Sequence, residues 1–472
     1  MSSENKLKSG SLGLFSIVFF VVAAASPLTG IVGVLPVAFS LGNGAGVPGV
    51  YLLAGILLVL FSFGFVAMSK HTSESGAFYA YISKGLGFSS GLAGLNLALL
   101  GYICMQFAIS AMFGFFTDEL IKSFHIHSPI PWWGYSIFMQ IIVILLGISK
   151  VEIGGKVLGL LMIFEIGIVM LLDYAILHRT STIEFSSFAP STLFSGNFGI
   201  AMVFAICSFI GFEATALYAE ECKNPEKNIS RATFIAVIII TLFFSFSAWA
   251  VIQHLTSLSK TVNFASIDAT TLIFSMTQQL LGDWAVQAMS ILLVTSLFAA
   301  NQAFHNSLSR YLFTMGRDKL AWSRLSDIHK KHQTPYMAGI VQGIFMIIML
   351  LLFGLFKLDP MNNVFAWSSV LGSMAILALQ VGVCFAVIRF FKMNKHLNVS
   401  KWSAVIAPAI SAAGMTYVLF NVFENLKVIS GSSSPVLLAL PWIILGTILL
   451  GFLKALHVKY QNKKVTLPIL ER

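Results

Sequence analysis

The chain has 472 residues, of which 57% are hydrophobic and 10% are charged. Soluble domains carry about 25% charged residues, so this chain has too few charges to cover the surface of a water-soluble globular enzyme of its size. The apolar excess therefore predicts a protein whose surface faces lipid. The net charge is +10, and in a soluble protein such a charge would suggest nucleic acid binding. The distribution of Lys and Arg along this chain argues against nucleic acid binding.

Apolar runs long enough to cross a bilayer, about 20 residues each, recur along the whole chain. Charged or Pro/Gly-marked breaks separate them, and polar tails are expected at residues 1–12 and 457–472. The sequence thus predicts an all-α membrane protein with twelve transmembrane helices. The expected spans are 13–41, 47–69, 88–117, 130–149, 153–177, 196–219, 232–256, 281–309, 336–356, 363–388, 402–424 and 434–456.

Lys and Arg residues are divided unevenly between the two sides that twelve spans define. The N-terminal side, with the even-numbered connections and the C-terminal tail, carries 24 of them, and the opposite side carries 5. Because cytoplasmic loops are enriched in Lys and Arg, both termini are expected to be cytoplasmic, in a multi-pass protein of the plasma (inner) membrane. Membrane orientation explains the positive charge, so the lipid bilayer is an expected partner and nucleic acid is not.

Other functional classes fit the sequence less well. The connections are too short for a soluble nucleotide-binding domain, and no GxxxxGK[ST] motif occurs, which disfavours a pump driven by ATP. The four cysteines have no metal-binding spacing, so neither a metal nor another cofactor is expected. A membrane-embedded enzyme usually needs clustered His, Asp and Glu, whereas the ten histidines are scattered. An enzyme or a receptor is the weaker alternative to a transporter.

Two predicted spans combine helix-breaking residues with polar side chains near mid-membrane, the first after Ala25 and the sixth after Cys207. Proline removes a backbone donor and glycine weakens a helix, so both segments are expected to unwind; a simple packing kink is the alternative. Unwound backbone in a bilayer lines a cavity or is buried in protein, where it can bind the carboxylate and ammonium of an amino acid. The substrate-binding residues expected here are Ser26, Thr29, Gly30, Ile31, Gly33, Ser208, Phe209, Gly211 and Phe212.

The two breaks also indicate an internal repeat. Gly30 and Gly211 lie 181 residues apart, and each opens a set of five predicted spans, at residues 13–177 and 196–388. Because five is an odd number, the two sets cross the membrane in opposite orientations, as in an inverted repeat. The last two spans, at residues 402–456, follow the second repeat.

The sixth span and the loop after it carry a long motif of mixed chemistry. FIGFE at residues 209–213 and EECKNPEKNISRA at residues 220–232 resemble the GFE…EE.KNP…RA signature of the amino acid-polyamine-organocation (APC) permeases. SRYLFTMGRD at 309–318 and SGAFYAY at 75–81 are similar to two further patterns of that family. The chain departs from the family in the spacing of the first-span glycines and in Ser230, where proline is common.

This resemblance implies a five-plus-five inverted repeat with discontinuous helices 1 and 6 (the LeuT-like or APC fold). It implies secondary active transport of amino acids by alternating access, with polyamines or other organic amines as the alternative substrates. The substrate would lie between spans one, three, six, eight and ten. Asn301 in span eight is a further expected contact. Tyr102 and Gln106 are four residues apart on one face of span three and are expected to meet the substrate, with simple helix packing as the alternative. The presumed site has no Lys or Arg, which favours a neutral side chain; the sequence determines neither the direction of transport nor the oligomeric state.

Two intramembrane carboxylates are the expected coupling and gating groups, because a charge within the membrane is costly and normally functional. Glu213 lies in the sixth-span break, where the family resemblance implies a gate or a proton-responsive site; a structural hydrogen bond to the neighbouring half-helix is the alternative. Glu165, midway through span five, is expected to carry a coupling proton, with an interior hydrogen bond as the alternative, and Asp173 is expected to be solvated. Thr295 and Ser296 offer hydroxyls for sodium, but such hydroxyls more often bond to their own helix. A proton or a counter-substrate is therefore favoured over sodium.

Charged residues after the sixth span and at the end of the eighth are expected to be cytoplasmic loop charges that pair or sit in water. If any of them acts in transport, it acts as an inner gate between these two groups. His305 is expected to be a satisfied interior or interfacial histidine. The charges are Glu220, Glu221, Lys223 and Lys227 after the sixth span, and Arg310 and Arg317 after the eighth.

Overall fold

The computed structural model describes residues 10, 12–71, 77–149, 151–258, 263–264, 267–430 and 436–462. In this part of the chain all regular structure is helical apart from one isolated β-bridge between Leu12 and Cys222. Most of the expected N-terminal tail, the C-terminal tail from residue 463, and Ser75 and Gly76 of the SGAFYAY motif lie outside the described residues.

Eleven helical stretches of the described residues are long and apolar enough to cross a membrane. A helix is the expected form for each, because lipid offers no partner to the backbone N–H and C=O groups. Trp132–Ile148, at the place of the expected fourth span, is a shorter apolar helix of 17 residues. The protein is thus an all-helical, multi-pass membrane protein. The eleven stretches are Leu14–Leu41, Gly44–Ser69, Phe88–Ser123, Gly159–Arg179, Phe198–Tyr218, Pro225–Ser257, Asp283–Arg317, Tyr336–Leu355, Pro360–Met393, Trp402–Glu424 and Val436–Tyr460.

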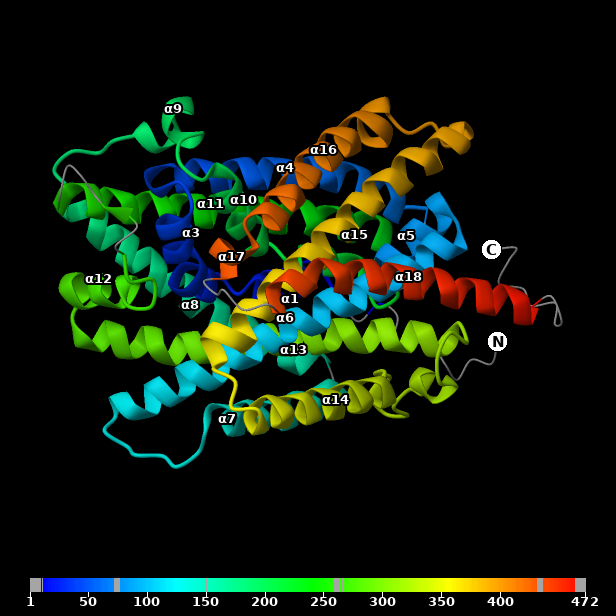
Figure 1. Ribbon diagram of the computed structural model, residues 1–472, viewed down its shortest axis with the longest axis horizontal. Helices are drawn as coiled ribbons and strands as arrows, with labels where there is room; N and C mark the ends of the chain where they lie inside the picture. The colour runs from blue at the N-terminus through cyan, green and yellow to red at the C-terminus, as the bar shows by residue number, and fades with distance from the viewer. Residues whose placement is uncertain are drawn as a thin grey trace.

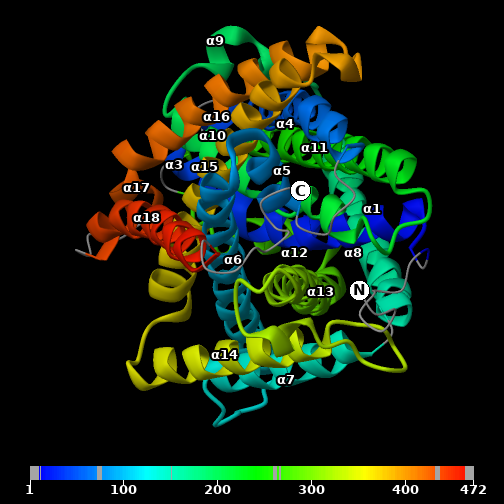
Figure 2. The ribbon, with the colours of Figure 1, turned by 90° about the vertical axis from the view of Figure 1, so that its right-hand side faces the viewer.

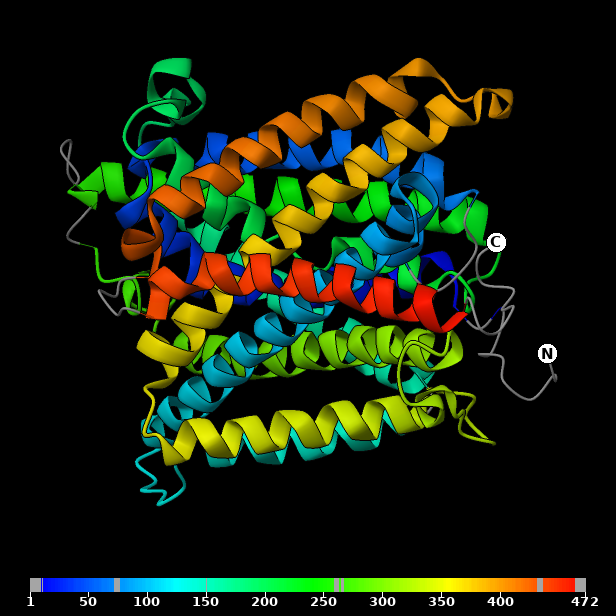
Figure 3. The ribbon, with the colours of Figure 1, turned by 45° about the vertical axis from the view of Figure 1, so that its right-hand side comes forward.

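The long helices form one elongated bundle (Figure 1). The helix drawn at the centre of Figure 2 is α13, seen almost end-on. Figure 3 shows the yellow α14, the orange α16 and the red α18 at full length on the outside, where each has many exposed apolar side chains. The long helices after the first span are α4 (Val47–Ser69), α6 (Phe88–Ser123), α7 (Trp132–Ile148), α8 (Val151–Arg179), α11 (Pro225–Leu258), α13 (Asp283–Arg317), α14 (Tyr336–Leu355), α15 (Ala366–Met393), α16 (Ala407–Glu424) and α18 (Val436–Asn462).

Short helical elements connect these spans. One of them, α5, contains residues 77–81 of the SGAFYAY motif. Its Phe78 and Tyr81 are buried against Phe65 of α4, with ring centroids 5.7 and 5.2 Å away. The short α-helices are α5 (Ala77–Leu86), α9 (Pro190–Leu193), α12 (Leu272–Leu281) and α17 (Leu426–Ser430). The short 3-10 and π elements are η3 (Gly44–Gly46), η4 (Ser186–Phe188), η7 (Ser323–Ser326), η8 (Pro360–Phe365), η9 (Lys395–Leu397) and η10 (Trp402–Ile406).

The first span is broken where the sequence predicts it. Helix α1 (Leu14–Ala25) ends at Ser26, whose φ of 47° is left-handed. The chain restarts at once as α2 (Pro27–Thr29), since a proline is well placed in the first turn of a helix. It continues through the π turn η2 (Gly30–Val34) into α3 (Leu35–Leu41). The predicted unwinding of the first span is confirmed at Ser26.

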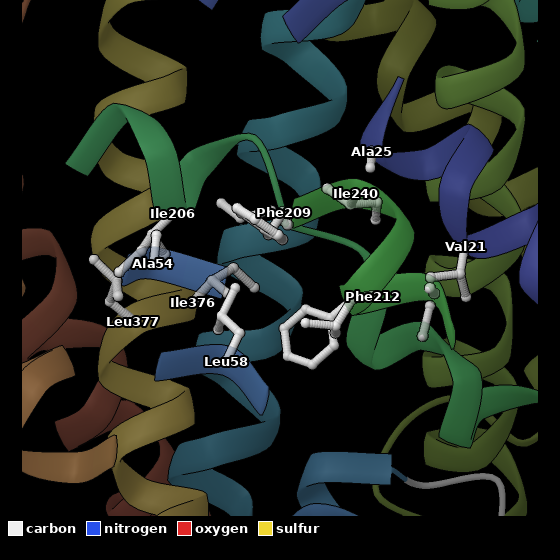
Figure 4. Packing of buried hydrophobic residues seen from close by; sticks show 14 of the residues in the cluster. Val21, Ala25, Ala54, Leu58, Ile206, Phe209, Phe212, Ile240, Ile376 and Leu377 are labelled. Atoms are coloured by element: carbon white, nitrogen blue, oxygen red, sulfur yellow. The ribbon is translucent and has the colours of Figure 1, made fainter. Parts of the chain in front are cut away.

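The sixth span is broken as well. Helix α10 (Phe198–Cys207) gives way after four residues to the 3-10 helix η5 (Phe212–Tyr218). Gly211 between them has a φ of +112°, which a residue with a side chain rarely adopts. In Figure 4, Phe209 and Phe212 lie on this segment among buried residues such as Val21, Leu58 and Ile376. The predicted break in the sixth span is therefore confirmed.

Helix α13 differs from the prediction at its end. It runs to Arg317, eight residues past the expected boundary at residue 309, and Arg310 within it is 1% exposed. The expectation that Arg310 is a loop charge is wrong, because a buried partner satisfies its guanidinium and the helix continues through it. Helix α11 likewise begins at Pro225, before the expected residue 232, and α6 continues past residue 117 to Ser123.

Candidate functional site

The two helix breaks lie directly against each other. A Cβ built on Gly211 would lie 2.7 Å from the Cβ of Ala24, the residue two positions before Ser26. Further along, the Phe20 ring of α1 stacks on the Tyr218 ring of η5, with centroids 5.4 Å apart. Glycine is therefore required at position 211 both by its backbone conformation and by this close approach.

A chain of buried polar side chains leads from the first-span break to a carboxyl group. The Ser26 hydroxyl donates to Oγ1 of Thr29 at 2.7 Å and pairs with the Ser296 hydroxyl of α13, also at 2.7 Å. The Ser296 side chain also interacts with the carboxyl group of Glu165 on α8, which is 2% exposed. The hydroxyl of Thr295 instead donates to the Leu292 carbonyl of its own helix. The structure thus brings Thr29, Ser26, Ser296 and Glu165 into one continuous contact.

Glu213 is buried at the start of η5 with both carboxylate oxygens satisfied. The Tyr102 hydroxyl of α6 donates to Oε1 at 3.0 Å, and the Gly211 backbone N–H donates to Oε2 at 3.1 Å. Tyr102 itself packs between the rings of Phe304 and Tyr311 on α13. Glu213 therefore links the sixth-span break directly to the third span and, through Tyr102, to the eighth.

Aromatic rings cover the breaks. A Cβ on Gly30 would lie 2.4 Å from the Phe244 ring of α11. The Phe244 ring therefore packs directly against the backbone of Gly30. Tyr51 of α4 stacks on Phe244 at 5.3 Å and its hydroxyl meets the Ser208 hydroxyl at 3.0 Å. Phe209 lies 6.3 Å from Phe244 and is fully buried. No motif in the sequence distinguishes Tyr51 or Phe244, because both stand in otherwise apolar helices.

Two of the residues expected to contact substrate belong to a second polar network. Gln106 of α6 donates to Asn301 of α13 at 2.9 Å, and Asn301 donates to the Ser110 hydroxyl at 2.7 Å. Gln342 of α14 donates to Gln106 and also pairs with His305. These bonds join Gln106 and Asn301 to α14 rather than to the helix breaks. His305 is an interior histidine, 1% exposed, as expected. It is only partly satisfied, because Nδ1 pairs with Gln342 whereas the buried Nε2 has no hydrogen-bond partner among the described residues.

A buried ion pair lies at the end of η5. Arg310 of α13 reaches Oε2 of Glu221 through Nε at 2.7 Å and Nη2 at 2.6 Å, and its guanidinium lies over the Tyr218 ring at 4.5 Å. Glu220 pairs with Arg317 at 2.9 Å in a more exposed position. Of the charges expected to pair or to sit in water, Glu220 and Glu221 are paired. Glu221 is 3% exposed, so it is not a solvated loop charge.

The segment before α1 reinforces this ion pair. The Leu12 N–H donates to the Glu221 carbonyl at 3.0 Å, and the Lys223 N–H donates to the Leu12 carbonyl at 2.8 Å. These two bonds form the Leu12–Cys222 bridge. The backbone of Glu221 is therefore tied to the start of the first span while its side chain is tied to the eighth.

Asp173 of α8 is buried, contrary to the expectation that it is solvated. It is 1% exposed, and its Oδ2 accepts from the Ser247 hydroxyl of α11 at 2.6 Å. The prediction is wrong because α8 turns this face toward α11, which an almost uniformly apolar helix does not reveal in its sequence.

The arrangement of broken helices and intramembrane carboxylates agrees with the comparison to known proteins. The family model for amino acid permeases matches residues 14–469. The chain belongs to the amino acid permease family. The permease is a transporter of amino acids and not an enzyme.

Relatives of the permease have diverse substrates. It is 24% identical over 396 residues to the branched-chain amino acid permease BcaP of Bacillus subtilis, covering 80% of this chain and 82% of the relative. It is 25% identical over 462 residues to the gamma-aminobutyric acid permease of the same bacterium, covering 93% and 92%. It is 26% identical over 361 residues to the human cationic amino acid transporter 4, covering 70% and 54%.

Replacing Gly211 by alanine should impair the permease severely. The new Cβ would meet Ala24 at 2.7 Å on a backbone with φ of +112°, and strain of this kind costs about 1–3 kcal/mol. We expect a lower thermal unfolding temperature in detergent and little amino acid uptake. Gly446→Ala on α18 is the matched control, because a Cβ there meets no atom within 4 Å. Equal behaviour of the two variants would contradict the importance of the contact between the breaks.

Proposed function

We propose that the permease is a secondary active transporter that moves amino acids with neutral side chains by alternating access, coupled to protons or to a counter-substrate. The chain of contacts from Thr29 through Ser26 and Ser296 to Glu165 is the observation that carries this proposal. It links a broken helix, where a substrate can bind backbone groups, to a carboxyl group that can take up a proton.

The substrate site in this proposal lies where the two breaks meet. Backbone groups freed at Ser26 and around Ser208 bind the carboxylate and ammonium of an amino acid, and the Phe209 and Phe244 rings enclose its side chain. No Lys or Arg occurs in either broken segment, which favours a side chain without negative charge. The proposed contacts are Ser26, Thr29, Gly30, Ile31, Gly33, Ser208, Phe209, Gly211 and Phe212, with Tyr102, Gln106 and Asn301 as contributors from α6 and α13.

Coupling in this proposal acts through Glu165. When Glu165 is ionised, the Ser296 hydroxyl can donate a hydrogen bond to it. When Glu165 is protonated, the carboxylic acid can instead donate a hydrogen bond to Ser296. Ser296 then redirects its own hydrogen bond to Ser26, which alters the first-span break. Substrate and proton thereby influence each other's binding through three side chains.

We further propose twelve spans, with Trp132–Ile148 as the fourth, arranged as two inverted repeats at residues 13–177 and 196–388. Support comes from the equivalent positions of the two breaks, after the start of each set. The excess of Lys and Arg on one side, 24 against 5, favours cytoplasmic termini in the plasma membrane. In this orientation the pairs Glu221–Arg310 and Glu220–Arg317 form an inner gate that separates to release substrate.

Reconstitution into proteoliposomes tests the function. Labelled neutral, acidic and cationic amino acids and polyamines are offered outside, with and without an acidic external pH. We expect gradient-dependent accumulation of a neutral amino acid, or exchange against internal amino acid if the coupling is to a counter-substrate. Transport of polyamines alone would replace the proposed substrate class. Absence of any transport above protein-free liposomes would reject the proposal.

A further inference from the structure

The buried face of α8 carries two carboxylates, and the proposed cycle uses one of them. Glu165 and Asp173 are 2% and 1% exposed, and the side chains between them on this face, such as Val169, are buried and apolar. Eight residues of helix separate the two acids by about 12 Å along the axis and by about 80° around it, so Glu165 faces α13 and Asp173 faces α11. Asp173 lies closer to the end of α8 at Arg179. It is a buried titratable group without an assigned role.

Asp173 is incompletely satisfied. Its Oδ2 accepts from Ser247 at 2.6 Å, whereas its buried Oδ1 has no hydrogen-bond partner among the described residues. None of the described ion pairs includes Asp173. Folded proteins pair nearly all buried polar atoms, and an unpaired charge in an apolar interior is costly. Such a carboxyl is best accommodated when it carries a proton.

The helices around α8 bring few charges to this level. Helices α1, α2 and α12 have no titratable residue, and Tyr135 is the one on α7. On α11, His254 lies seven residues beyond Ser247, is 8% exposed and has a buried Nε2 without a partner in the described chain. The remaining groups lie on either side of this level. Asp283 on α13 and His178 and Arg179 on α8 lie on the Asp173 side of Glu165. On the other side are Glu226, Lys227 and Arg231 on α11, and His305, Arg310, Tyr311 and Arg317 on α13.

We infer that Asp173 is a second protonation site of the permease, located between the Arg179 end of α8 and Glu165. The Asp173 carboxylate takes a proton from water at that end and becomes a carboxylic acid. It returns the proton to water at the same end and is left ionised, stabilised by the hydroxyl of Ser247. The buried and unpaired nitrogen of His254 lies near Arg179, at the end of α8 from which the proton enters.

This inference rests on the proposed proton coupling, so its test includes a measurement that does not depend on transport. Infrared difference spectra of the purified protein, recorded as the pH is changed, detect the carbonyl band of each buried acid that gains a proton. We expect one such band to disappear in Asp173→Asn and to remain in Glu165→Gln. A band pattern unchanged in Asp173→Asn would overturn the inference, whatever the transport assays give.

Transport then assigns a role to the proton. Asparagine preserves size and an acceptor for Ser247 but carries no proton. The rate of gradient-driven uptake, divided by the rate of exchange in the same liposomes, should fall by about tenfold or more in Asp173→Asn, a modest effect for a proton-transfer group. Asp173→Glu should restore part of it.

Ser247→Ala separates this role from a purely structural one. It removes the hydrogen bond between α8 and α11 and leaves the carboxyl group in place. The ratio of gradient-driven uptake to exchange should therefore fall much less than in Asp173→Asn, and its pH profile should move to higher pH because the ionised carboxylate loses a donor. If Ser247→Ala and Asp173→Asn lower the unfolding temperature alike and neither moves that profile, Asp173 serves only to hold the two helices together. If the unmodified protein exchanges substrate but shows no gradient-driven uptake, proton coupling fails, and the infrared titration still decides whether Asp173 takes up a proton.

Discussion

Replacing Glu165 by glutamine should abolish accumulation driven by a pH gradient. Glutamine has nearly the same size and can still hydrogen-bond Ser296, but it cannot take up a proton. With one proton per substrate, an external pH one unit below the internal pH supports about tenfold accumulation. The unmodified permease should approach that ratio of internal to external amino acid, and Glu165→Gln should reach equal concentrations. Steady-state uptake of labelled substrate in proteoliposomes measures both.

Two serine and threonine variants make this test specific. Ser296→Ala removes the hydroxyl between Glu165 and Ser26, so it should raise the substrate concentration needed for half-maximal uptake and leave the titratable carboxyl in place. Thr295→Ala, one residue earlier, removes a bond to its own helix and should behave like the unmodified protein. If Glu165→Gln still accumulates substrate against a gradient, the coupling proton is carried by another group.

The membrane fold could be predicted largely from composition and the spacing of apolar runs. A span must satisfy its backbone within the helix, so an apolar run of sufficient length has essentially one available structure. The breaks were predictable for a local reason too, since Pro27 and Gly211 disturb a helix wherever it packs. Local chemistry therefore determined these features, and the structure places both breaks within a few residues of the expected positions.

Contacts between distant helices could not be predicted in the same way. Ser26 and Ser296 are 270 residues apart, and Tyr51 and Ser208 are 157 residues apart. Each pairing depends on the rotation of both helices about their axes. In soluble proteins a polar face indicates that rotation, but helices that are apolar all round give no such signal. For the same reason the burial of Asp173 was not predicted.

The end of the eighth span shows how one unseen partner changes an interpretation. A single arginine after an apolar run normally indicates the end of a span, because an unpaired charge in the membrane is costly. Arg310 is an exception because its guanidinium has partners inside the protein. It donates hydrogen bonds to Glu221 and to the carbonyl of Asn306, and it lies over the Tyr218 ring. Asn306 is on the same helix as Arg310, but only the fold brings Glu221 and Tyr218 to it.

Removing the Arg310 side chain should therefore be strongly destabilising. Arg310→Ala leaves the Glu221 carboxylate buried without its partner, which typically costs about 3–5 kcal/mol. Lysine should not rescue it, because Nε and Nη2 both contact Glu221 and Nη1 donates to Asn306, whereas lysine offers a single ammonium group. Arg317→Ala is the matched control. Its pair with Glu220 is 21% and 23% exposed, and such pairs contribute about 1 kcal/mol or less. Thermal unfolding in detergent should separate the two variants clearly.

The same ion pair also tests the inner gate, because loss of stability can be separated from loss of closure. The double variant Glu221→Leu, Arg310→Met removes both charges, and replacing a whole buried pair by apolar side chains is often neutral or stabilising. It should regain most of the stability that Arg310→Ala loses. If the pair closes the inner face, a maleimide reagent should nevertheless label Cys222, which is 4% exposed and adjacent to Glu221, faster in this double variant than in a protein with the pair intact. The other three cysteines are replaced by alanine in both proteins. Restored stability with unchanged labelling of Cys222 would mean that Arg310 and Glu221 hold the fold together without gating transport.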